Sequence, residues 1–269
     1  MTQEAMTAPS EPVAPHMLPW RAWIAHFKGS RASCRVFLPA AVGSQAALAW
    51  RGSPGRGAWW VAAFCFFLAA LASCQVMRQG RRPQCPLLLG SLLASSGAAI
   101  AGPSGVGRLL AMVSILGGAV ALLWHSRQDW LGGRAAGWSY ELATMPWFSA
   151  LVLGLSGGWL LSRASLRAPI GLGEQRVVAL GIGTMLLEQV VFLRWRAGIA
   201  RPGNRGRLPF RDVPHALAYL LQVRAWGGYV LPATLMTLTL IGFGAHWSIL
   251  AILFFLLGEA LWYGLVEVR

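Results

Sequence analysis

Two glutamates stand out in this sequence as side chains that could carry out chemistry. Glu188 lies in the apolar stretch 177–193 and Glu259 in the apolar stretch 247–266, and no other acidic residue falls inside such a stretch. A charged side chain facing lipid would cost about 2.5–3.5 kcal/mol, so both glutamates should face the interior of a helix bundle. There a carboxyl group could accept and release a proton. The alternative is a structural role, in which each glutamate pairs with a loop arginine or with a polar group on a neighbouring helix.

Glu188 is the stronger candidate for proton handling. The arginines nearest to it in its own apolar stretch are Arg176 and Arg194, twelve residues before it and six residues after it. Contact within one helix needs a spacing of three or four residues. Arg194 could therefore reach Glu188 only by extending back from the membrane surface. The spacing predicts that Glu188 has no arginine partner within its own helix.

Histidine and cysteine give few further candidates. His125 is the only one of five histidines at the end of an apolar stretch, and haem ligation within a bundle normally needs two facing histidines. Two interpretations of His125 remain open, an interfacial anchor beside Trp124 and a proton-handling group. The four cysteines form no C-x-x-C pair and are interpreted as small buried apolar residues, so we expect no metal site. No catalytic motif for substrate chemistry is visible.

The composition indicates the environment in which these side chains must act. The 269 residues are 56% hydrophobic and 12% charged, whereas average globular chains are about 25% charged. This excludes a soluble globular enzyme, and the high apolar content also excludes a disordered chain. The net charge of +14 could suggest nucleic acid, but with this apolar content the basic residues belong in loops that meet anionic headgroups. The chain is predicted to be an all-α integral membrane protein.

Apolar runs of spanning length recur between arginine-rich segments and predict a bundle of about eight transmembrane helices. Residues 1–19 are polar and proline-rich and are predicted to form a disordered tail, so the transmembrane domain comprises residues 20–269. Residues 20–33 suit a short amphipathic segment at the membrane surface. The predicted spans are 35–50, 58–77, 85–103, 107–125, 146–162, 177–193, 228–245 and 247–266.

The basic residues predict the orientation of this bundle. With eight spans, 17 of the 23 Lys and Arg residues fall on the side that carries both termini. The positive-inside rule then places both termini in the cytoplasm, as expected for a multi-pass protein of the inner (cytoplasmic) membrane. The longest loop, 194–226, carries seven arginines. It could bind headgroups, with an interfacial helix around 212–224, or it could dock a soluble acidic partner.

Several local patterns, each faint, occur in an order that is similar to one known family. Ser73 is followed by Arg78 and then by Gly80-Arg81-Arg82-Pro83. Arg127, Arg134 and Trp138 precede Thr144 and Phe148, Arg224 precedes Pro232, and Gly258 precedes Glu259. In this order and spacing the chain resembles a divergent member of the DMSO reductase membrane-anchor subunit family, over roughly residues 30–267. The family's histidine implicated in quinol binding falls on Arg78, and its Arg-Glu pair after the third helix is replaced by the apolar run 97–100.

The resemblance implies a role in anaerobic electron transport. Such an anchor holds an iron–sulfur subunit and a molybdopterin catalytic subunit on the membrane and passes them electrons from menaquinol or ubiquinol. This chain would then be a non-catalytic subunit of an oxidoreductase complex that binds no cofactor of its own besides quinol. Quinol or proton handling would fall to Glu188, Glu259, Arg78 and His125, and partner docking to Arg127, Arg134, Arg81 and Arg82. Two alternatives stay open: a degenerate anchor without quinol turnover, and a membrane transporter or assembly protein without a redox partner.

Overall fold

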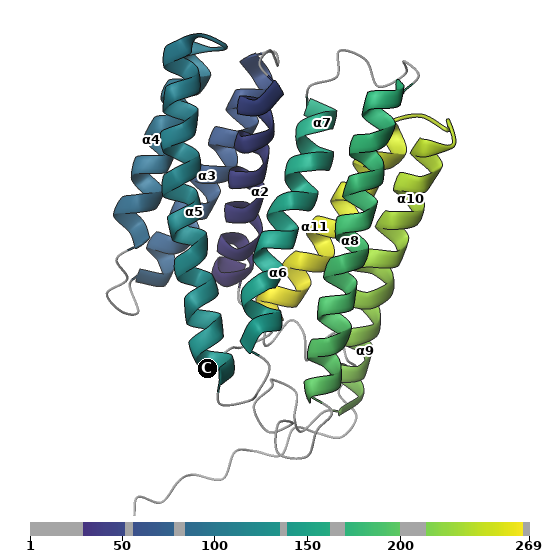
Figure 1. Ribbon diagram of the computed structural model, residues 1–269. Helices are drawn as coiled ribbons and strands as arrows, with labels where there is room; N and C mark the ends of the chain where they lie inside the picture. Colours follow the sequence, from purple (N-terminus) through teal and green to yellow (C-terminus); the bar gives the residue numbers. More distant parts are fainter. Residues whose placement is uncertain are drawn as a thin grey trace, which may run out of the picture.

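The computed structural model describes residues 29–51, 56–77, 84–134, 139–161, 170–199 and 214–265, and this part of the chain is helical almost throughout (Figure 1). Its helices join into eight unbroken rods, two of which contain a π-helical turn. The rods are α2 (Gly29–Arg51), α3 (Arg56–Met77), α4 (Gln84–Ala101), α5 (Gly105–Arg134), α6–η1–α7 (Ser139–Val152, Leu153–Gly157, Gly158–Leu161), α8 (Leu172–Ile199), α9–η3–α10 (Pro214–Ala225, Trp226–Val230, Leu231–Leu240) and α11 (His246–Leu265).

The rods agree with the predicted helices, since each predicted span overlaps one rod. Among the described residues, three helical segments are long and apolar enough to cross a membrane: Gly105–Arg127, Leu172–Ala197 and His246–Gly264. Two shorter apolar helices, Ala58–Ser73 and Pro86–Ala101, accompany them. The surface supports the same assignment, because large apolar side chains such as Leu93, Ile100 and Leu116 are more than half exposed. Exposed apolar side chains of this kind are suited to lipid.

The seventh rod corrects one prediction. We expected an interfacial helix around 212–224 and a separate span starting at 228, but α9, η3 and α10 form a single rod from Pro214 to Leu240. Residues 194–199 likewise belong to α8, so both ends of the expected 194–226 loop are helical. Arg224 therefore lies well inside a rod. Residues 1–19, predicted to be a disordered tail, most of the predicted amphipathic segment 20–33, and residues 200–213 fall outside the described residues.

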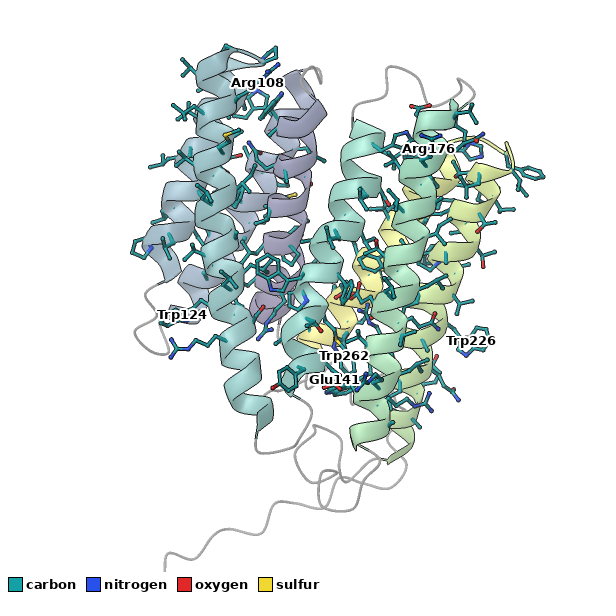
Figure 2. The ribbon with its side chains drawn as sticks, viewed as in Figure 1. Arg108, Trp124, Glu141, Arg176, Trp226 and Trp262 are labelled. Carbon is teal, nitrogen blue, oxygen red and sulfur yellow. The ribbon has the colours of Figure 1, made fainter. Side chains whose placement is uncertain are left out.

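The rods run up and down in sequence, so α2 begins and α11 ends at the same end of the bundle, the lower end in Figure 1. Helices α3, α4 and α5 form one side and α6 to α11 form the other. Helix α2 lies between them and packs on α3 and α5 as well as on α6, η1 and α11. Arg108 and Arg176 lie at the upper end in Figure 2, whereas Glu141 and Trp262 lie towards the lower end.

Helix α2 contacts the side formed by α6 to α11, called the second side below, through a backbone-to-backbone crossing at Gly43 and Gly154. A Cβ atom at Gly43 would stand 2.0 Å from the Ala150 carbonyl oxygen, and one at Gly154 would stand 2.7 Å from the Gly43 carbonyl oxygen. Only glycine fits at such a distance, and small residues at a crossing let membrane helices approach closely. The crossing lets α2 contribute Val36 and Ala40 to the apolar core of the second side.

Candidate functional site

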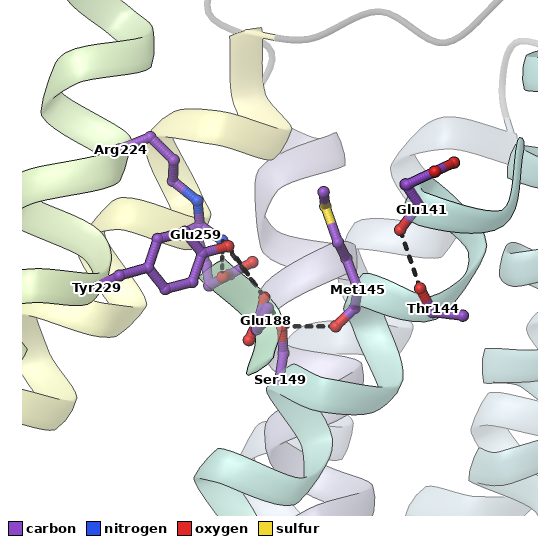
Figure 3. A network of polar contacts seen from close by, with 8 residues as sticks. All are labelled: Glu141, Thr144, Met145, Ser149, Glu188, Arg224, Tyr229 and Glu259. Atoms are coloured by element: carbon purple, nitrogen blue, oxygen red, sulfur yellow. Dashed lines mark hydrogen bonds and ion pairs between the residues drawn. The ribbon is translucent and has the colours of Figure 1, made fainter. Parts of the chain in front are cut away.

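A cluster of buried polar side chains lies between α6, α8, α9–η3 and α11, and Figure 3 shows how its members face one another. Ser149 comes from α6, Glu188 from α8, Arg224 from α9, Tyr229 from η3 and Glu259 from α11. None of the five is more than 1% exposed. The expectation that Glu188 and Glu259 face the bundle interior is thus confirmed, and the two glutamates lie in one cluster.

Arg224 is the centre of this cluster. Its Nη2 atom forms an ion pair with Glu259 Oε1 and lies 3.5 Å from Glu188 Oε1. The same nitrogen donates a hydrogen bond of 2.7 Å to the Tyr229 hydroxyl, and the guanidinium stands over the Tyr229 ring, 4.4 Å from its centroid. One guanidinium therefore serves two carboxylates and a phenol. In surroundings of low dielectric constant these interactions are far stronger than at a protein surface.

Glu188 has two further hydrogen-bond donors. The Tyr229 hydroxyl donates to Glu188 Oε1 over 3.4 Å. The Ser149 hydroxyl lies 3.1 Å from both Glu188 Oε1 and the Met145 carbonyl oxygen and can donate to either. A hydrogen bond to a polar group on a neighbouring helix was the structural alternative for Glu188, and Ser149 supplies one. Glu188 has a cation partner as well, Arg224, which comes from another helix.

The π-helical turn η3 explains how Arg224 and Tyr229 come to share a face. They are five residues apart, and in an α-helix of about 3.6 residues per turn side chains at this spacing diverge. The wider π turn brings residues five apart towards the same face, and such turns are frequent at functional sites. A second close crossing brings in Glu259, because a Cβ atom at Gly258 would stand 2.7 Å from Gly228 Cα. Backbone contact between η3 and α11 thus places Glu259 beside Arg224.

Aromatic rings surround the cluster. Trp262 packs edge-on against Trp195 and Phe192, with ring centroids 4.5 and 5.3 Å apart. Phe192 also lies 5.7 Å from the ring of Tyr229, and Tyr229 lies 6.4 Å from Phe255. All five rings are fully buried. They exclude solvent from the ion pairs, which strengthens the pairs and raises the cost of losing one partner.

The cluster has unused hydrogen-bonding capacity. Five polar atoms in or beside the cluster are buried and have no hydrogen-bond partner among the described residues. They are Glu188 Oε2, Glu259 Oε2, the Tyr263 hydroxyl oxygen, Arg224 Nε and Arg224 Nη1. Buried polar atoms in native proteins almost always have a partner. The two free carboxylate oxygens are acceptors and the free guanidinium nitrogens are donors. The cluster therefore combines unpaired acceptors and unpaired donors at one buried place between the helices.

His125 belongs to a different part of the bundle, between α2, α3 and α5. Its Nε2 atom lies 3.4 Å from Cys34 Sγ, which in turn lies 3.2 Å from the Ser73 hydroxyl oxygen. His125 is 5% exposed, so its ring packs inside the bundle. The anchor interpretation suits Trp124 and Arg127 better, since the Arg127 guanidinium lies 6.0 Å from the Trp124 ring centroid.

The remaining candidates stay as predictions. Arg78, Arg81 and Arg82 lie outside the described residues, and the Arg134 side chain also lies outside the described part of α5. Arg127 is exposed and could meet a partner or lipid. Arg194 extends away from Glu188 and approaches Glu141, with Arg194 Nε 3.8 Å from Glu141 Oε1. Among the described residues, no group of three or more His, Cys, Asp or Glu side chains could hold a metal ion.

Arg224 is the functional candidate that sequence reasoning missed. We counted it with the loop arginines that meet headgroups, but it is 1% exposed. Two signals were present in the sequence. The first is that two glutamates in apolar stretches need a cation. The second is that Arg224 has hydrophobic residues on both sides of it in the sequence. These are Leu220, Leu221, Ala225 and Tyr229, and all four are buried in the structure.

Taken together, fold and site define a helical membrane protein with an ion-pair cluster enclosed between its helices. No known protein family, curated protein or solved structure matches this chain.

Proposed function

We propose that the chain crosses the cytoplasmic membrane eight times, with both termini in the cytoplasm. The eight alternating rods and the excess of basic residues on the side of both termini support this topology. Arg108 and Arg176, two of the six basic residues assigned to the other side, lie together at the upper end of the bundle in Figure 2. Two of the other rods contain the shorter apolar helices Ala58–Ser73 and Pro86–Ala101.

Reporter fusions test the topology. Fusions at residue 269 and within residues 200–210 should both report a cytoplasmic location, because an even number of spans separates the N-terminal tail from each of them. A fusion near residue 165 should report the opposite side. Reporters at 269 and 200–210 on opposite faces of the membrane would contradict the eight-span bundle.

We further propose that the protein is the membrane-anchor and quinol-linked electron-transfer subunit of a molybdopterin oxidoreductase complex. The order of motifs that resembles the DMSO reductase anchors supports this, and the buried Arg224 cluster is the observation that carries it. The partners would be an iron–sulfur subunit and a molybdopterin subunit, which hold the redox centres. Arg127, Arg134, Arg81 and Arg82 would dock them at the cytoplasmic face.

The cluster supplies what quinol oxidation asks of an anchor. A quinol, menaquinol or ubiquinol, supplies two electrons and releases two protons. Glu188 Oε2 and Glu259 Oε2 have no hydrogen-bond partner among the described residues, and Tyr229 and Ser149 fix the position of Glu188. Arg78 stands where the related anchors have histidine, and an arginine cannot act as a base. We therefore assign proton acceptance to this cluster, with Glu188 as the accepting side chain.

Replacement of Glu188 by glutamine tests this function. The natively isolated complex should contain molybdenum and iron, and Glu188→Gln should leave that metal content unchanged, because glutamine keeps the size and the hydrogen bonds of the side chain. Quinol-driven turnover should fall about 10²-fold or more, as is typical when a general base is lost. Turnover with an artificial electron donor that bypasses the membrane should be unchanged.

Each alternative gives a different result. Normal quinol-driven turnover in Glu188→Gln would assign a purely structural role to Glu188. Molybdenum and iron in a wild-type complex that lacks quinol turnover would indicate a degenerate anchor. A protein isolated without either metal would indicate a transporter or an assembly protein.

A further inference from the structure

We infer that the pair of carboxyl groups of Glu188 and Glu259 holds one proton in total. Glu188 carries this proton and is neutral, and Glu259 is ionised and is the permanent counter-ion of Arg224. This assignment goes beyond the proposed function, because it describes the resting protein without quinol and without a partner subunit. It gives the two glutamates different roles although both are buried and both contact the same guanidinium.

The charges around the cluster set the number of protons. Arg224 is the only buried arginine among the described residues, and it faces two carboxyl groups. Arg35 on α2 lies over the Tyr263 ring, 5.6 Å from its centroid, but is half-buried and so more strongly screened. Two ionised carboxylates would leave the enclosed cluster with one uncompensated negative charge, which costs several kcal/mol in an apolar interior. One shared proton makes the cluster neutral.

The contacts indicate which carboxyl group holds this proton. Arg224 Nη2 forms its direct ion pair with Glu259 Oε1, whereas Glu188 Oε1 is 3.5 Å away. The negative charge is more stable on the carboxylate closest to the cation, since the attraction falls with distance. Glu188 Oε1 accepts from the hydroxyls of Tyr229 and Ser149, as the carbonyl oxygen of a neutral acid can. Glu188 Oε2 has no hydrogen-bond partner among the described residues and is the atom that carries the proton.

Protonation of Glu188 would determine how the site works, and this step rests on the proposed function. Glu188 has to release its proton before it can accept one from quinol. Because the cluster is neutral when it holds one proton, it can take up only one proton at a time. The two protons of a quinol would therefore leave one after the other through Glu188. Glu259 would keep its charge throughout and hold Arg224 in place.

Infrared spectroscopy of the protein in lipid, labelled with carboxyl-¹³C glutamate, tests the assignment. Solvent-exposed glutamates are ionised at neutral pH, so a protonated carboxyl band reports an enclosed acid. We expect one such band in the wild type. It should vanish in Glu188→Gln, and it should also vanish in Glu259→Gln, because Glu188 then becomes the only counter-ion of Arg224.

Two mild variants locate the proton. Ser149 contacts Glu188, so Ser149→Ala should shift the frequency of the band. Ser156 is an equally buried serine of the same rod that contacts Met236, and Ser156→Ala should leave the band in place. A wild-type spectrum without the band, a band of full intensity in Glu188→Gln, or a band that Ser149→Ala does not shift would each overturn the inference. If the infrared spectra are as expected but the protein does not oxidise quinol, the proposed function is refuted and the inference about the proton stands.

Discussion

Replacement of Arg224 by leucine is expected to lower the free energy of unfolding by about 3–5 kcal/mol, the usual cost of removing one partner from a buried ion pair. The loss is large because Glu188 and Glu259 stay enclosed among aromatic rings after their shared cation has gone. The measurement is denaturant unfolding of the purified protein in detergent, together with the yield of folded protein from membranes.

Two comparisons make this result specific to the cluster. Arg194→Gln removes an arginine whose side chain is 75% exposed and whose contact with Glu141 is worth about 0–1 kcal/mol, so its stability should be close to that of the wild type. The triple variant Arg224→Met, Glu188→Gln, Glu259→Gln removes all three ionisable groups and should recover most of the loss. If Arg224→Leu and Arg194→Gln were equally stable, the cluster would contribute nothing to folding.

Gly43→Ala is expected to destabilise the protein by about 1–3 kcal/mol, and Gly43→Val by more, through overpacking of a close crossing. The added Cβ atom would meet the Ala150 carbonyl oxygen at 2.0 Å and the Gly154 nitrogen at 2.9 Å, and neither backbone atom can rotate away. Helix α2 would have to move from η1, which opens the contact between the two sides of the bundle. Thermal unfolding in detergent measures the effect.

Two glycines of the same bundle serve as matched controls. Gly90 on α4 and Gly183 on α8 have open space where a Cβ atom would stand. Alanine at either position should be neutral or stabilising by up to about 1 kcal/mol, since alanine is the better helix former. Equal losses at Gly43, Gly90 and Gly183 would show that backbone propensity, and not the crossing, controls these positions.

The sequence predicted the helices and the burial of both glutamates for simple physical reasons. A long apolar run between arginines has few other structures available to it, and a carboxyl group inside such a run has to point away from lipid. Arg224 escaped detection because its charge lowered the average hydropathy of its window, so the predicted span was started after it, at residue 228. A charged residue can belong to a span when its partner lies on another helix, and one sequence does not show which helices meet.

Local geometry was harder to foresee than element type. The π turn at Trp226–Val230 brings Arg224 and Tyr229 onto one face, but hydrophobic periodicity cannot distinguish it from a regular helix. Glycines permit close packing of membrane helices, but only the three-dimensional arrangement shows that Gly43 meets Gly154 and that Gly228 meets Gly258. The pairing of His125 with Cys34 likewise joins α5 to α2 through two residues that are 91 positions apart in the sequence.

The contact between α2 and α11 has a consequence for how the protein is made. Helix α2 leaves the ribosome long before α11, yet the two pack against each other in the finished bundle. Helix α2 must therefore wait in the membrane, with the face that will meet α11 still uncovered, until α11 has been made. Contacts between such distant segments form late. Chains that stall before α11 would also lack Glu259, so Arg224 would be left without its closest counter-ion, and quality-control proteases could recognise them as incomplete.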